Sequence, residues 1–170
     1  MGRESIGIVD FSTTFNDRDL DSAEALPQQL SLFDCFPQKV VTFMSMHEMH
    51  GSTFFRVLDQ ADRPIIIDIR GYPFFDMGGV RRDIVSSYFA RNNYPYKHAP
   101  ISMIRGNDSR DRWNMRSKVV DIFKDMDRFF DIESKFALML VDNFEDALMM
   151  ISYAKSIDSI SRDYRFSVVR

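Results

Sequence analysis

Short apolar runs and longer segments with helical spacing alternate along the chain after residue 38. The run Ile65-Ile66-Ile67-Asp68-Ile69 is apolar on both faces of an extended chain, which is typical of a central parallel strand covered on both sides. Other segments are either rich in β-branched and aromatic residues or have apolar residues three and four apart. The predicted strands are residues 39–46, 64–69, 94–99, 136–141 and 165–169, and the predicted helices are residues 52–58, 80–92, 111–130 and 144–154.

Strands that alternate with helices predict an α/β fold, with a Rossmann-like, mostly parallel sheet and helices on both of its faces. The regular pattern begins at Lys39, so residues 39–170 are predicted to form a single domain. Residues 1–38 are predicted to form an acidic N-terminal arm. The chain has 170 residues and 45% hydrophobic content, which suffices for one substantial core.

Composition narrows the functional classes. The formal net charge of -3 argues against a protein that binds nucleic acid through its overall charge. The single cysteine, Cys35, excludes an internal disulfide and a cysteine-rich metal site. The chain begins without an apolar signal core and has no run long enough for a membrane span. These features predict a soluble, cytoplasmic protein with no membrane partner.

The arm contains an apolar pentapeptide between two prolines, Pro27 and Pro37, which bias Leu26 and Phe36 toward extended geometry. An extended segment can insert a few apolar side chains into pockets of a partner while its backbone forms hydrogen bonds there. The predicted partner-binding residues are Gln29, Leu30, Ser31, Leu32 and Phe33.

Gln-Leu-Ser-Leu-Phe resembles the pentapeptide by which many bacterial replication and repair proteins bind the DNA polymerase sliding clamp. The resemblance covers five residues and implies an adaptor or accessory protein of replication or repair, with the clamp as its partner. Leu32 and Phe33 would be the anchors and Gln29 the polar specificity group. The alternative is that these apolar side chains cover the protein's own core.

Charge is distributed unevenly. Residues 1–38 have seven acids and two bases, whereas residues 70–118 have ten bases and four acids. The basic segment 70–118 could contact a nucleic acid backbone or another phosphate-bearing ligand. The alternative is that its arginines are solvated, or pair with the acidic arm and with the acidic stretch 121–133.

In parallel sheets, ligands bind near the carboxyl ends of the strands. That rule nominates Asp68, Arg70 and Tyr72 after one strand, His98 after the next and Asp142 after a third. Asp68, Arg70 and His98 are the candidate catalytic residues.

Two glycines precede the helix predicted over residues 80–92. Gly78 and Gly79, together with Arg81 and Arg82, could bind an anion, because free amides at a helix start and two guanidinium groups both favour one. The alternative is that the glycines form an ordinary turn.

The stretch Ile66 to Pro73 with the later Tyr94-Pro95-Tyr96-Lys97-His98 resembles the bacterial domain-of-unknown-function family four-eight-eight. That resemblance implies a Rossmann-like α/β domain over residues 39–170. The family often has a cysteine-histidine-arginine cluster at a late strand, where this chain has Leu140 to Glu145. The corresponding alternative function is a small enzyme that acts on a phosphate-containing or nucleic-acid substrate.

Other chemical motifs are missing or incomplete. His47, Glu48 and His50 lack the spacing of a zinc protease motif and an evident third ligand, so no metal is predicted. The sequence has no phosphate-loop, dinucleotide or serine-elbow motif, and no cofactor is predicted. Trp113 is expected to be buried along one side of the long helix; the alternative is that it stacks on a base.

Overall fold

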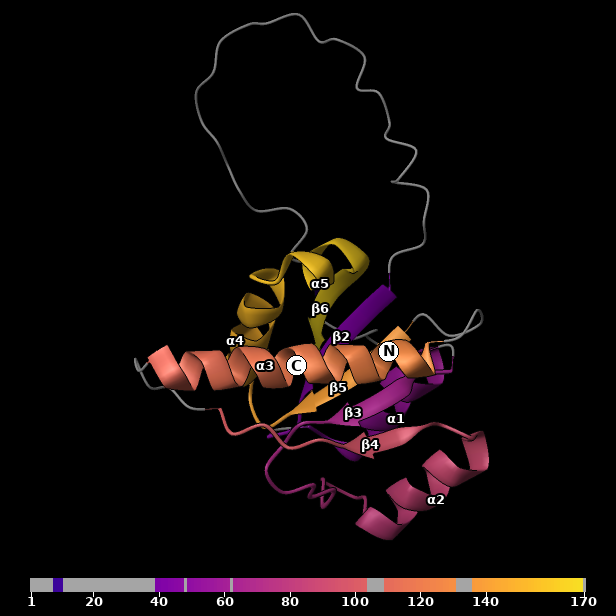
Figure 1. Cartoon of the computed structure of the whole chain (residues 1–170). Helices are drawn as coiled ribbons and strands as arrows, with labels where there is room; N and C mark the ends of the chain where they lie inside the picture. The colour runs from indigo at the N-terminus through magenta and orange to yellow at the C-terminus, as the bar shows by residue number, and fades with distance from the viewer. Residues whose placement is uncertain are drawn as a thin grey trace, which may run out of the picture.

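The structure is a computed structural model that describes the backbone of residues 8–10 and residues 39–47, 49–61, 63–103, 109–130 and 136–169. The predicted partner-binding residues 29–33 and most of the predicted arm lie outside the described residues. The described segments form the α/β fold predicted from the sequence, shown in Figure 1.

A six-stranded sheet forms the centre of the fold, with the order β1-β6-β2-β5-β3-β4. All neighbouring strands from β6 to β4 are parallel, whereas β1 is antiparallel to β6. The strands are β1 (Ile8–Asp10), β2 (Lys39–Ser45), β3 (Ile65–Asp68), β4 (Tyr96–His98), β5 (Phe136–Val141) and β6 (Tyr164–Val169).

Five described helices connect or follow these strands. They are α1 (Gly51–Gln60), α2 (Arg82–Asn92), α3 (Ser109–Phe129), α4 (Phe144–Lys155) and α5 (Asp158–Asp163). The sequence pattern did not predict α5, because this short helix has few apolar residues and buries only Ile160.

The helices cover the two faces of the sheet according to the direction in which the chain crosses it. From β2 to β3 and on to β4 the chain moves toward one edge, and α1 and α2 pack on one face with Met44, Ile66 and Leu138. From β4 to β5 and on to β6 it moves back, and α3, α4 and α5 pack on the other face. Right-handed crossover connections require this change of face when the direction reverses.

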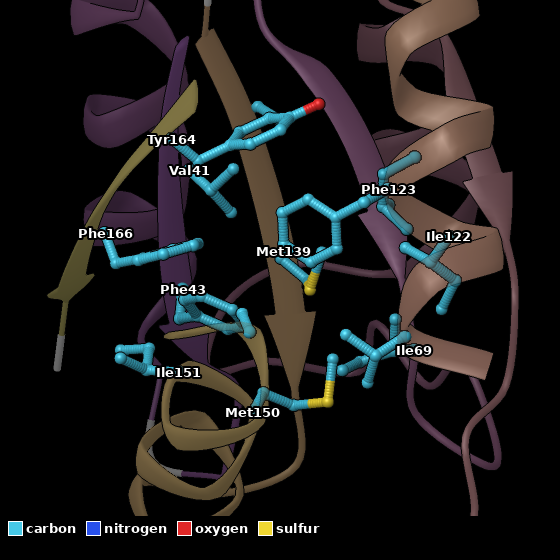
Figure 2. Close-up of a cluster of buried hydrophobic side chains, with 14 of the residues drawn as sticks. Val41, Phe43, Ile69, Ile122, Phe123, Met139, Met150, Ile151, Tyr164 and Phe166 are labelled. Atoms are coloured by element: carbon cyan, nitrogen blue, oxygen red, sulfur yellow. The ribbon is translucent and has the colours of Figure 1, made fainter. Parts of the chain in front are cut away.

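The larger apolar layer lies between the sheet and the helices α3, α4 and α5. Figure 2 shows its side chains converging from several elements, with Phe43 of β2, Met139 of β5 and Phe123 of α3 among them. Phe123 contacts Tyr164 edge-on, with ring centroids 4.8 Å apart. This packing fixes α3 across the strands and so determines which of its side chains point outward.

Strand β1 joins part of the predicted arm to the domain. Asp10 pairs with Ser167 of β6, and Lys39 at the start of β2 pairs with Tyr164 of the same strand. β1 is antiparallel to β6, so it runs toward the end of the sheet where the parallel strands begin, although Asp10 itself lies beside Ser167, partway along β6. Lys39 begins β2 at that end, beside Tyr164.

Candidate functional site

The carboxyl end of β3 brings together three of the residues nominated from the sequence: Asp68, Arg70 and His98. Asp68 is the last residue of β3 and pairs in register with His98 of β4. Nε2 of His98 lies 2.8 Å from the backbone oxygen of Arg70. The three residues that follow neighbouring parallel strands are thus adjacent in the structure. The arrangement of their side chains decides what chemistry they can perform.

Asp68 and Arg70 form a buried ion pair with two parallel hydrogen bonds. Nε of Arg70 donates to Oδ1 of Asp68 at 2.9 Å, and Nη2 donates to Oδ2 at 2.7 Å. The relative exposure is 0% for Asp68 and 4% for Arg70. Such paired geometry is the strongest form of arginine-carboxylate contact.

The remaining polar groups of this pair are also occupied. The Tyr96 hydroxyl donates to Oδ2 of Asp68 at 3.1 Å, and the Arg70 backbone N–H donates to Oδ1 at 3.2 Å. Nη1 of Arg70 donates to the Phe74 carbonyl at 2.7 Å, and its guanidinium carbon lies 4.9 Å from the centre of the Phe75 ring. The pair therefore fastens the loop after β3 to the sheet edge, and Asp68 has no open side from which to act as a base.

Burial, the nearby Asp68 charge and the hydrogen bond to Asp68 all raise the pKa of Tyr96, burial most strongly. The positive charges of Arg70 and Arg82 act in the opposite direction on this pKa. Tyr96 is therefore a neutral hydrogen-bond donor over the physiological range. Sequence reasoning missed its role, because a tyrosine in an edge strand gives no sign of its cross-strand partner.

The predicted anion-binding residues have different neighbours. Gly78 packs against the start of α1: a Cβ on it would lie 3.0 Å from the His50 ring, and its carbonyl accepts from the Gly51 N–H at 3.3 Å. Gly79 has a φ of +81°, a conformation that favours glycine. Packing and turn geometry thus account for both glycines, whereas Arg82 lies near Tyr96.

Asp142 follows the carboxyl end of β5, and His47 and His50 follow the carboxyl end of β2. Asn143 caps α4 by accepting from the Asp146 N–H at 2.9 Å, and the Asp142 side chain forms no hydrogen bond or ion pair with a described residue. His50 caps α1 by accepting from the Ser52 N–H. Glu48 lies outside the described residues, among which no three potential ligands are grouped to hold a metal ion.

The basic segment 70–118 does not form one surface within the described residues. Arg70 is buried with Asp68, and Lys97 pairs with Asp125 of α3. The remaining described bases lie mainly on α2 and α3, which cover opposite faces of the sheet. The first half of α3 has the densest group: Arg110, Arg112, Arg116 and Lys118.

Trp113 is 70% exposed, so the expectation that it is buried is wrong. The buried stripe of α3 passes through Met115, Val119, Phe123 and Met126. Trp113 precedes Met115 by two residues, which turns it about 200° away from Met115 around the helix axis. Helical spacing predicted the helix but not this rotation.

A second network, again of one aspartate, one cation and one tyrosine, lies at the opposite end of the sheet. Asp127 of α3 accepts hydrogen bonds from Lys39 at the start of β2 and from the Tyr164 hydroxyl at the start of β6. The side chains of Lys39 and Asp127 are 31% and 46% exposed. This network fixes the residue at which the segment 11–38 joins the domain.

Comparison of the chain with protein-family models, with curated proteins and with solved structures found no match in any of the three. Among the described helices, none has the length and apolar character needed to cross a membrane.

Proposed function

We propose that this protein is an adaptor or accessory protein of DNA replication or repair that docks on the DNA polymerase sliding clamp through residues 29–33. The observation that carries the proposal is the sequence Gln29-Leu30-Ser31-Leu32-Phe33 between two prolines. Leu32 and Phe33 are the apolar anchors of an extended peptide, and Gln29 supplies the polar contact.

The attachment of the segment 11–38 supports this role. Asp10 and Lys39 flank this segment and lie beside Ser167 and Tyr164 of β6, and β1 runs toward the end of the sheet at which Lys39 begins β2. Six peptide links separate Phe33 from Lys39, and fully extended they span at most about 20 Å. A clamp bound to the pentapeptide would therefore face the end of the sheet where Lys39, Asp127 and Tyr164 lie.

The structure of the Asp68 cluster also favours a binding role over the enzyme alternative. An enzyme using Asp68 and Arg70 would need both groups to be open to a substrate. Here both are buried and bonded to each other, to Tyr96 and to the backbone. The remaining candidate, His98, lies beside this closed pair with its Nε2 at the Arg70 carbonyl.

The test is a clamp pull-down with the full chain. Replacing Leu32→Ala together with Phe33→Ala should weaken clamp binding by about 30-fold or more, since truncating one buried interface anchor already costs about 2 kcal/mol. The measurement is surface plasmon resonance with immobilised clamp, supported by the pull-down.

The matched control is Leu26→Ala with Phe36→Ala, which removes the same two residue types just outside the pentapeptide. This control should bind the clamp like the unmodified chain, and both variants should keep its melting temperature. Unchanged binding of the Leu32 and Phe33 double variant, or no binding by the unmodified chain, would sink the proposal.

A further inference from the structure

The first half of α3 presents a large aromatic ring to solvent among several cations. Trp113 is the only tryptophan in the chain and is 70% exposed. Arg110 and Arg116 lie three residues before and after it, so all three project from neighbouring positions on one side of the helix. Trp113 does not belong to either apolar cluster of the described residues.

Charge divides α3 into two halves. Between Arg110 and Lys118 the helix has four bases and one acid, Asp111, whereas residues 119–129 have three acids and two bases. The helix dipole favours acidic residues near the start of a helix and basic residues near its end, which is the reverse of this distribution. The dipole therefore does not account for the positions of these charges.

Contacts inside the domain account for the acidic half. Asp125 pairs with Lys97, and Asp127 pairs with Lys39, so these two carboxylates fasten α3 to the sheet. In the basic half, Arg116, which projects beside Trp113, is exposed and forms no ion pair with a described residue. Its charge is available to an external anion.

We propose that this surface of α3, formed by Trp113 with Arg110 and Arg116, binds single-stranded nucleic acid. Unpaired strands offer both a free base face, on which an indole stacks, and a phosphate backbone for the cations. Duplex DNA keeps its base faces inside the stack, and an acidic peptide matches the charges only. The inference goes beyond clamp docking and does not depend on it.

The sole tryptophan makes the test direct. Titrating the full chain with a thymidine oligonucleotide of about 20 residues at low salt, long enough for a typical single-strand site, should quench Trp113 fluorescence, because stacking places a base against the indole. With a fluorescent oligonucleotide and anisotropy as the readout, Trp113→Ala should weaken binding roughly 5- to 100-fold, the range of one stacked base. Trp113→Phe, which keeps an aromatic face, should recover part of that loss.

The cations are tested through the salt dependence of binding. Arg116→Ala should reduce the slope of log affinity against log salt by about 0.7, the contribution of one lost phosphate contact on a single strand. The matched control is Arg56→Ala, which removes the same charge from an exposed position of α1 on the opposite face of the sheet. This control should keep the slope and affinity of the unmodified chain.

Several results would overturn the inference. They are an unquenched tryptophan at saturating oligonucleotide, equal affinity of the unmodified chain and Trp113→Ala, and a loss of slope in the Arg56→Ala control as large as that in Arg116→Ala. Equal affinity for duplex DNA or for polyglutamate would also overturn it, by showing that charge alone is recognised. Failure of clamp docking would leave the expected results unchanged, because they use a different surface.

Discussion

Two networks, at opposite ends of the sheet, join an aspartate to one cation and one tyrosine hydroxyl. Asp68 binds Arg70 and Tyr96 at the carboxyl end of β3, and Asp127 binds Lys39 and Tyr164 at the start of β2 and β6. The first pair is buried, at 0% and 4% exposure of the side chains, whereas those of Lys39 and Asp127 are 31% and 46% exposed. Two networks of an aspartate, a cation and a tyrosine thus occupy very different electrostatic environments, with arginine as the buried cation and lysine as the exposed one.

The difference shows that burial, and not only the types of residue involved, sets how much such a network contributes to the free energy of unfolding. A buried charge that loses its partner keeps a large desolvation cost, whereas an exposed charge regains water. The Asp68 network is therefore a structural lock on the loop that follows β3. The Asp127 network lies where Lys39 begins β2, and it should contribute little to the free energy of unfolding.

The largest expected effect is at Asp68. Asp68→Asn leaves the Arg70 charge buried without a countercharge, so the free energy of unfolding should fall by about 3–5 kcal/mol in urea denaturation. Replacing both partners by apolar residues, Asp68→Leu with Arg70→Met, should cost less than this single change. A loss below about 1 kcal/mol for Asp68→Asn would show that water reaches the pair.

An intermediate effect is expected at alkaline pH, where the two networks should behave alike. Burial, followed by the neighbouring aspartate, raises the pKa of both Tyr96 and Tyr164. The fold favours the neutral hydroxyls, so this stabilisation is complete below the ordinary tyrosine pKa of about 10 and is lost as pH rises through the higher folded-state pKa.

Denaturation between pH 8 and pH 11 checks this expectation, with pH 10 as the point about which the decline should begin. Tyr96→Phe and Tyr164→Phe should each start from a lower stability and decline less steeply than the unmodified protein. A decline as steep in the double phenylalanine variant would assign the alkaline loss to other groups.

The smallest expected effect is at Asp127. Asp127→Asn should lower the free energy of unfolding by less than about 1 kcal/mol, because the ion pair with Lys39 is largely exposed. The difference from the unmodified protein should shrink further in about 1 M salt, where charges are screened within about 3 Å. An effect as large as that of Asp68→Asn would erase the distinction between the two networks.

Much of the fold followed from local patterns. The strand predicted over residues 136–141 has the observed bounds of β5, and the apolar run after Pro64 is β3. These strands are buried on both faces, so their sequence is apolar throughout and easily recognised. The short helix α5 escaped prediction because it lacks a repeated apolar stripe.

The candidate site followed from the sequence only in part. The rule for parallel strands placed Asp68 and Arg70 at a carboxyl end, but the closure of their pair depends on Tyr96 of β4 and on how the loop after β3 folds back to bring the Phe74 carbonyl to Arg70. Trp113 was assigned to the wrong side of its helix for a similar reason. The apolar stripe that packs on the sheet sets the rotation of α3. The helix has more apolar residues than this stripe can hold, so the sequence did not show that Trp113 lies outside it.

The sequence by itself determined the alternation of strands and helices, because each element shows its burial in its own local periodicity. The proposed docking pentapeptide at residues 29–33 likewise rests on the sequence alone, because the proposal uses only five neighbouring side chains. Only the tertiary structure decided which charges are buried with a partner and which face water. Asp68 and Trp113 show the reason, since the first is enclosed and the second is exposed by elements distant in the chain.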